Sequence, residues 1–418
     1  MKHINRRAFI KHTGMAGTAL SLGLVSACSS EKFKLVPVPE NERIKIGVIG
    51  LGYRGTDILR VLEQIPEFKV VACCDILDFR ITEALSKVNI TPKTYTDYRK
   101  MLDDKEIDAV VISTPLSEHY QMALDAIDCQ VHVMCEKALA YSIEQVLDIR
   151  KKALNYPKLF QVSYQYQLNP SFLVIKDLIQ NGYCGKITQI DGVWNGFNNW
   201  RRPVPSPELE RHANWRLYSE YSGGLMAEVG SHQLNLIDTI AGSHPAKVVG
   251  TGGIDYWKDG REVNDNVHTL FEYPNGLKVS FSATLSNMHE GFTIKFRGDK
   301  ATIVTKFMDE TYIYPEQDAD LAALGNVDGV TGASMKLFHR ENRKEIASSI
   351  YNDKRYPFDT SYLNATWILY KNFAAAIQGK EKLLLGLDEG CKSAIAVYMA
   401  NDAIQNEKVV RWLPEYDV

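Results

Sequence analysis

The stretch Arg43-Ile44-Lys45-Ile46-Gly47-Val48-Ile49-Gly50-Leu51-Gly52-Tyr53-Arg54-Gly55 decides the fold of the first half of the chain. A short apolar run of strand length leads into a Gly-x-Gly-x-x-Gly loop, and residues 56–62 continue with helical spacing. In this context the first glycine allows a tight turn, the second lets a pyrophosphate approach, and the third permits close helix packing. We therefore predict a dinucleotide site that includes Gly50, Gly52, Tyr53, Arg54 and Gly55.

A carboxylate follows the second predicted strand. Residues 70–74 form an apolar run that ends at Asp75, 20 residues after Gly55. A carboxylate at this spacing accepts hydrogen bonds from the adenosine ribose hydroxyls and repels a 2′-phosphate. Because Ile76, and not an arginine, comes next, the sequence favours NAD over NADP.

The order of strand-like and helical segments along the chain predicts two domains. Strand-like runs at 109–115, 131–135 and 160–164 alternate with helical patterns, which is typical of a parallel, doubly wound sheet. After Pro170, strand-like runs follow one another, with a hairpin-like turn at 274–276. We predict an α/β Rossmann domain over 43–165. An α+β domain over 166–418 is expected to form a largely antiparallel open β-sheet with helices.

The amino-acid composition and the net charge limit the classes of function that this protein can have. The 418 residues are 45% hydrophobic and 24% charged, as in ordinary globular proteins of about two domains. A net charge of −3 gives no electrostatic footprint for nucleic acid. No cysteine pair has the spacing of a zinc or redox site, so we expect no metal.

The N-terminus has the features of a targeting segment. Residues 1–27 contain Arg6-Arg7, a run of small apolar residues at 15–25 and no acidic residue. The run is too short to span a bilayer. Residues 5–11 resemble a twin-arginine export signal, and Val25-Ser26-Ala27-Cys28 resembles a lipobox in which Cys28 would be lipidated. The alternatives are a plain cleaved signal and a short N-terminal helix.

With residues 28–42 as a tether, this pattern predicts a bacterial protein exported by the twin-arginine machinery. A lipid on Cys28 would anchor it at the periplasmic face or cell envelope.

Several motifs in order resemble one family. Gly50-Leu51-Gly52, Asp75, Thr114-Pro115 with His119, Glu136-Lys137 and the segment 223–232 together are similar to the Gfo/Idh/MocA family of NAD(P)-dependent oxidoreductases. The resemblance covers residues 43–418. It implies that Lys137 lies near the nicotinamide and hydrogen-bonds the reacting hydroxyl, and that His232 exchanges the hydroxyl proton. It adds Thr114, Pro115, His119, Glu136 and Lys137 to the cofactor residues, and Glu228 to the catalytic ones.

The chain departs from the family pattern at three of these positions. Glu228 stands where an aspartate is usual, Ala138 where a proline is usual, and Gln167 where an arginine is common.

Aromatic rings and planar donors near the expected pocket suit sugars, which present apolar C–H faces and many hydroxyls. We expect substrate contacts from Tyr166, Trp200, Arg201, Trp215 and Arg216.

An exported enzyme cannot rely on a soluble NAD pool, so we expect NAD to stay tightly bound. The resemblance implies hydride transfer between NAD and a sugar or glycoside hydroxyl, with C3 the expected position. The alternative resembles the NAD-dependent glycosidases of family 109, such as α-N-acetylgalactosaminidases, which act by transient C3 oxidation and elimination. A third interpretation is a non-catalytic sugar sensor. The sugar and the oligomeric state, including a homo-oligomer, stay open.

Overall fold

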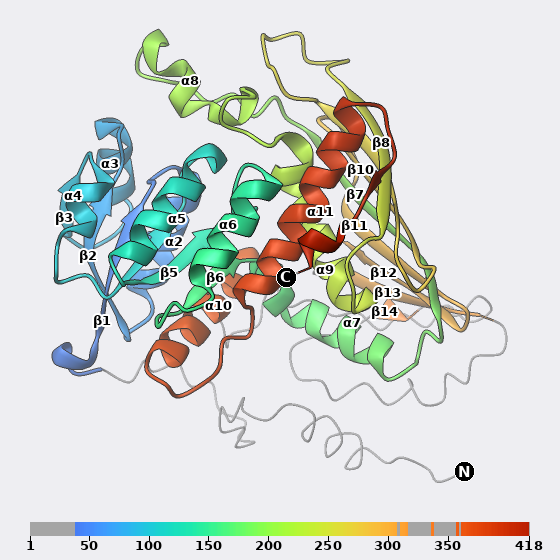
Figure 1. The fold of residues 1–418 in the computed structure, drawn as a ribbon, viewed down its shortest axis with the longest axis horizontal. Helices are drawn as coiled ribbons and strands as arrows, with labels where there is room; N and C mark the ends of the chain where they lie inside the picture. Colours follow the sequence, from blue (N-terminus) through green and yellow to red (C-terminus); the bar gives the residue numbers. More distant parts are fainter. Residues whose placement is uncertain (1–37, 307–309, 317–335, 338–356, 359–360, 418) are drawn as a thin grey trace.

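The computed structural model describes residues 38–306, 310–316, 336–337, 357–358 and 361–417. Residues 1–27 and Cys28, which carry the predictions of export and lipidation, lie outside these ranges. Two β-sheets with their covering helices form the body of the molecule (Figure 1). Over the described ranges, no helix combines the length and the apolar character that crossing a membrane requires.

The first sheet has six parallel strands in the order β3-β2-β1-β4-β5-β6. Its central strands are apolar and almost wholly buried, because helices cover both faces. The predicted Rossmann fold is confirmed. The strands are β1 (Ile44–Ile49), β2 (Phe68–Cys74), β3 (Lys93–Tyr95), β4 (Ala109–Ile112), β5 (His132–Glu136) and β6 (Phe160–Ser163). The helices are α2 (Tyr53–Glu63), α3 (Asp78–Leu85), α4 (Tyr98–Leu102), α5 (His119–Asp128) and α6 (Ile143–Ala153).

The second sheet has nine strands in the order β14-β13-β12-β11-β7-β10-β9-β8-β15. All neighbours are antiparallel except the pairs β7–β10 and β13–β14, so the predicted largely antiparallel sheet is confirmed. Buried and exposed residues alternate along β9 and β10, which shows that only one face meets the core. Gly276, at φ +86°, makes the predicted turn between these two strands. The strands are β7 (Ile187–Phe197), β8 (Lys247–Gly253), β9 (Asn266–Glu272), β10 (Lys278–Thr284), β11 (Ser286–Gly298), β12 (Ala301–Lys306), β13 (Glu310–Pro315), β14 (Lys336–Leu337) and β15 (Val410–Arg411).

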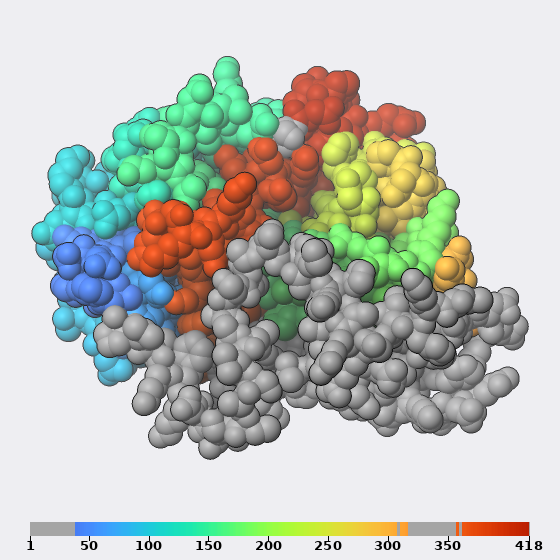
Figure 2. Space-filling view, turned by 90° about the horizontal axis from the view of Figure 1, so that it is seen from below, coloured from blue at the N-terminus to red at the C-terminus, as the bar shows by residue number. Residues whose placement is uncertain are grey.

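Two C-terminal helices join the domains. Helix α10 (Ser361–Ile377) packs on α2, and α11 (Leu387–Gln405) packs on α6 and β6 as well as on β8 and on α9 (Ser231–Ala241). Figure 2 shows the orange C-terminal segment beside the blue N-terminal one. The end of the chain thus contributes to the core of the first domain, although its sequence belongs to the predicted second one.

Candidate active site

The glycine loop after β1 is built for a close approach. A Cβ on Gly50, at φ +88°, would come within 2.6 Å of the Ser113 carbonyl oxygen, and one on Gly55 would overlap the Gly50 carbonyl oxygen. A Cβ on Gly52 would meet nothing within 4 Å. The outer two glycines therefore allow tight backbone packing, while Gly52 leaves open space beside the N-terminus of α2. That geometry fits a pyrophosphate, which binds to the free N–H groups at a helix N-terminus.

A cavity of about 680 Å³ extends from this loop between the two domains. The volume is within the range of ligand sites. In the chain as described, no group of three or more His, Cys, Asp or Glu residues could hold a metal ion. The predicted site residues that line the cavity are Gly50, Gly52, Tyr53, Arg54, Asp75, Thr114, Pro115, Trp200, Trp215, Arg216 and Glu228.

Asp75 lies in the cavity wall at the end of β2. Its carboxylate accepts hydrogen bonds from the backbone N–H of Leu51, at 2.7 Å, and of Leu77, at 2.9 Å. Burial raises the pKa of Asp75, and these two backbone bonds oppose that rise. A carboxylate has about four acceptor positions, so two remain for ribose hydroxyls. The residue can thus support the glycine loop and hold NAD at the same time.

Arg54 and Glu136, both predicted to contact the cofactor, pair with each other. Arg54 lines the cavity, but its guanidinium donates to Glu136 at 2.7 Å, to Thr366 of α10 at 3.0 Å and to Ser163 of β6 at 3.3 Å. Glu136 is buried and does not line the cavity. The pair fixes the start of α2 against β5, β6 and α10.

His119 supports the loop that carries Thr114 and Pro115. Burial lowers the pKa of His119 from 6.5 to about 4, so the ring is neutral at pH 7. Its Nε2 lies 3.1 Å from the Thr114 carbonyl oxygen. The neutral ring can donate this hydrogen bond. His119 therefore holds Thr114 of the cavity wall in place without lining the cavity itself.

Lys137 reaches from the end of β5 to the second domain. Its ammonium donates to the carbonyl oxygens of Glu228, at 3.0 Å, and Ala227, at 3.3 Å, in the π-helical turn η6 (Met226–Gly230). The Lys137–Ala138 peptide bond is cis. Burial lowers the pKa of Lys137, and the carboxylate of Glu228 opposes that effect. Two of the three ammonium protons are used, which leaves one for a substrate oxygen.

His232 lies in the first turn of α9 within an aromatic cage. Its ring centroid is 4.6 Å from that of Tyr166 and 5.8 Å from that of Trp194, which lines the cavity. Nδ1 is buried and has no hydrogen-bond partner among the described residues. Burial, followed by the charges of Lys137 and Arg54, holds the pKa of His232 well below 6.5. A neutral imidazole beside a cation can accept a proton.

Glu228 is the counterion of the site. Its carboxylate pairs with Arg216 at 2.8 Å, and the Arg216 guanidinium lies 4.2 Å from the centroid of the Trp215 ring. Burial alone would raise the pKa of Glu228, but Arg216 and Lys137 together hold it below its ordinary value. Glu228 is therefore ionised at neutral pH and balances two cations.

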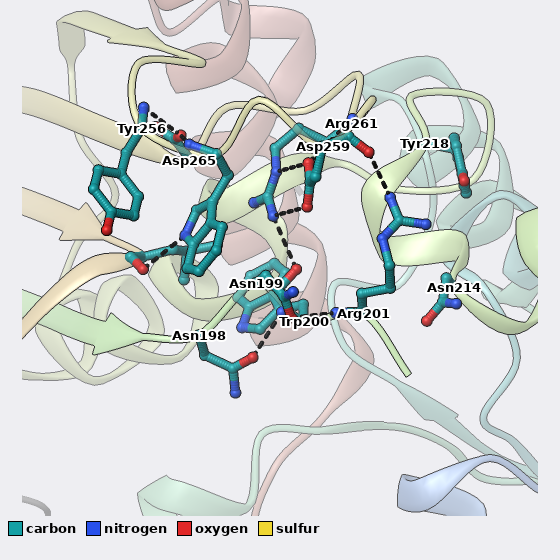
Figure 3. Close-up of polar contacts among 12 residues, drawn as sticks. Asn198, Asn199, Trp200, Arg201, Asn214, Tyr218, Tyr256, Asp259, Arg261 and Asp265 are labelled. Carbon is teal, nitrogen blue, oxygen red and sulfur yellow. Dashed lines mark hydrogen bonds and ion pairs between the residues drawn. The ribbon is translucent and has the colours of Figure 1, made fainter. Parts of the chain in front are cut away.

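Two of the predicted substrate residues do not line the cavity. Tyr166 contacts the His232 ring. Arg201 donates to the Asp259 carbonyl oxygen at 2.9 Å (Figure 3). Arg201 also pairs with Glu210. The neighbouring Arg202 lines the cavity in place of Arg201.

Sequence reasoning also missed Trp194. Its place in a strand-like run, which is β7 in the structure, was the only signal available in the sequence. That signal does not tell on which face of the sheet the side chain lies.

Comparisons with known proteins agree with this geometry. The family model described as the oxidoreductase family with NAD-binding Rossmann fold matches residues 44–164, and that of the Gfo/Idh/MocA C-terminal domain matches 172–304. Inositol 2-dehydrogenase of Salmonella typhimurium is 30% identical over 36% of this chain and 45% of its own length. A glycosyl hydrolase family 109 protein of Shewanella woodyi is 26% identical over 52% of this chain and 50% of its own length. The matched segments thus span about half of these curated relatives.

Solved structures show the same fold. Levoglucosan dehydrogenase in complex with NADH and levoglucosan superposes with a TM-score of 0.70 at 19% identity, over 88% of this chain and 99% of that one. Both family models match in sequence order, and the loop, sheet and cavity agree with them. The chain therefore belongs to the Gfo/Idh/MocA family, with an NAD-binding Rossmann domain followed by the C-terminal domain of that family.

Proposed function

We propose that this protein is an oxidoreductase that transfers a hydride between NAD and a hydroxyl-bearing carbon of a sugar or glycoside, expected at C3. One observation supports the proposal: Lys137, with a proton left to donate, bonds to Glu228 of the cavity wall, and its charge reaches the neutral His232, which packs on Trp194 of the same wall. Alcohol oxidation needs a cation and a base, and these two residues have that chemistry.

His232, Lys137 and Glu228 have different roles in the proposed reaction. His232 accepts the proton of the reacting hydroxyl, and Lys137 donates a hydrogen bond to the same oxygen as negative charge develops on it. The C–H bond breaks with its electron pair, and the carbon becomes a ketone carbon. NAD, when bound, supplies the acceptor for that hydride. Glu228 keeps Lys137 charged, since its carboxylate raises the pKa that burial lowers.

Sugar chemistry is supported by the cavity wall and by the relatives. Trp194, Trp200 and Trp215 offer aromatic faces, and Arg216 offers planar donors beside Glu228. Such a surface suits the C–H faces and hydroxyls of a pyranose. Inositol 2-dehydrogenase and levoglucosan dehydrogenase are named for polyhydroxylated ring substrates.

The glycosidase alternative is supported by the family 109 relative. A ketone at C3 makes the hydrogen at C2 acidic, so a base can remove it and the substituent at C1 leaves. Water then adds at C1, the proton returns to C2, and the hydride taken from C3 returns to that carbon, so that the ketone becomes a hydroxyl again. The same Lys137 and His232 could support both reactions, and only the products distinguish them.

Mass spectrometry of products tests the proposal. Purified protein, with no NAD added, is incubated in D2O with methyl and nitrophenyl glycosides. We expect a glycoside two mass units lighter, together with NADH on the protein. Free sugar that carries deuterium at C2 would show the glycosidase reaction in its place.

Two variants and one null result complete the test. K137M and H232N, compared with a surface variant such as K300M, should lose turnover while they keep NAD. No product from any sugar, on protein that contains NAD, would refute both reactions and favour the sugar sensor.

We also propose that the mature protein is exported by the twin-arginine machinery, retains NAD tightly and is lipid-anchored through Cys28. Arg6-Arg7, the absence of acidic residues in 1–27 and the lipobox-like 25–28 support this. Fractionation tests it: C28S should move the protein from the membrane to the soluble fraction, and replacing Arg6 and Arg7 by lysine should block export. Membrane association that survives C28S would contradict the anchor.

A further inference from the structure

Four arginines line the cavity, and their partners differ. Arg54 pairs with Glu136 at 2.7 Å, Arg80 with Glu83 at 3.0 Å and Arg216 with Glu228 at 2.8 Å. Arg202 is the fourth, and its guanidinium has neither a carboxylate partner nor a hydrogen bond within the residues that the structure describes. Among the described residues that line the cavity, Arg202 is therefore the arginine without an ion-pair partner.

Arg202 belongs to the second domain but lies over the glycine loop of the first. Its guanidinium carbon is 4.4 Å from the centroid of the Tyr53 ring. Tyr53 is the first residue of α2 and directly follows Gly52, the glycine beside which the cavity is open. The unpaired cation is thus held at the helix N-terminus where the loop geometry admits phosphate.

The backbone of Arg202 is fixed. The buried Asn214 side chain accepts the Arg202 N–H at 2.7 Å and donates to the Arg202 carbonyl oxygen at 2.9 Å. The segment before it is held as well, because Arg261 donates to the Asn199 carbonyl oxygen at 2.9 Å and Arg201 donates to Asp259 (Figure 3). These contacts place Arg202 over the loop without using its guanidinium.

We propose that Arg202 binds the pyrophosphate of the dinucleotide and, stacked on Tyr53, retains the cofactor from the side of the second domain. The inference rests on the proposed function in taking NAD as the ligand. A pyrophosphate carries two negative charges, and the N-terminus of α2 supplies only about half a positive charge. A guanidinium matches phosphate geometry with paired donors. Arg202 therefore meets most of the remaining charge, since the other arginines that line the cavity are already paired.

Retention of NAD by the purified holoprotein tests the inference without any sugar. NAD still bound is quantified by chromatography at intervals during dialysis, for the unaltered protein, R202Q and R202K. R211Q is the matched control, because Arg211 is also in the second domain and stacks at 4.2 Å on a tyrosine, Tyr218, but does not line the cavity. We expect R202Q to release NAD about 10- to 100-fold faster, the range of one charge-assisted hydrogen bond. R202K should recover part of the loss, and R211Q should match the unaltered protein.

Displacement of bound NAD by added NADP distinguishes binding of the pyrophosphate, which both dinucleotides carry, from binding of the 2′-phosphate, which only NADP carries. If Arg202 served a 2′-phosphate, R202Q would release NAD normally and would weaken displacement by NADP, which would overturn the pyrophosphate assignment. Equal NAD release by R202Q and R211Q would overturn it too. Neither of these two results bears on the proposed function, whereas unaltered protein that binds no NAD would refute the proposed function together with this inference.

Discussion

Acid should destabilise this protein in part through the buried His119. His119 is 1% exposed, and burial lowers its pKa from 6.5 to about 4. Because the folded pKa lies below the unfolded one, the unfolded state binds more protons as the pH falls. The stability contributed by the neutral ring is therefore complete above pH 6.5 and is lost on acidification towards pH 4.

The magnitude follows from the shift. Each pKa unit corresponds to about 1.4 kcal/mol, so the whole effect approaches about 3 kcal/mol at low pH. Between pH 7 and pH 5 the unfolded ring takes up its proton while the folded ring does not, which amounts to about 2 kcal/mol. Glu136, Glu228 and Lys137 are the charged groups whose fields reach the ring.

The substitution H119Q isolates this contribution. Glutamine keeps a neutral N–H that can donate to the Thr114 carbonyl oxygen but has no proton to gain. We expect the free energy of unfolding of the unaltered protein to fall from pH 7 to pH 5 by about 2 kcal/mol more than that of H119Q. Urea unfolding followed by tryptophan fluorescence measures both.

A control variant carries the same His-to-Gln substitution at an exposed position. H268Q replaces a histidine on the exposed face of β9 and reports the effect of the substitution without burial. If H119Q and the unaltered protein lose equal stability between the two pH values, the reasoning about a buried neutral ring is refuted.

The glycine loop, the base and the ribose carboxylate give three further predictions. G52A should keep the melting temperature of the unaltered protein but bind NAD at least about tenfold more weakly, since the added Cβ enters the cavity. G55A should lower the free energy of unfolding by roughly 2 kcal/mol or more, because its Cβ overlaps the Gly50 carbonyl oxygen. Turnover should stay on a plateau from pH 8 to below pH 6.5, because the pKa of His232 is well below that value; an acid limb centred at 6.5 in the pH–rate profile would contradict this. D75N should reduce the preference for NAD over NADP by about tenfold in binding titrations, since the charge that repels a 2′-phosphate is removed.

Much of the fold could be predicted because its signals are local. The apolar run before Gly50, the glycine spacing and Asp75 lie within one βαβ unit, so their geometry follows from strand and helix periods. The antiparallel sheet was also predictable from its runs and from the turn at Gly276. The return of α10 to the first domain was not, because packing between segments 300 residues apart leaves no local pattern.

The site was predicted unevenly for the same reason. Lys137 and His232 were identified through motifs; neither lines the cavity, but each contacts a residue that does, Glu228 and Trp194 respectively. Arg201 and Arg202 are adjacent and chemically equal, and only the bonds of Asn214 and Asp259 decide which of them faces the cavity.

The sequence by itself determined the dinucleotide loop, the preference for NAD and the order of the two domains, because each depends on residue types at short spacing. Only the tertiary structure decided the charge balance of the cavity. Arg54 and Lys137 meet partners 82 and 91 residues away and Arg216 meets Glu228 12 residues away, whereas Arg202 has no such partner among the described residues. Which charges are paired depends on distances of a few ångströms between side chains in the folded protein, and no pattern along the chain encodes such distances.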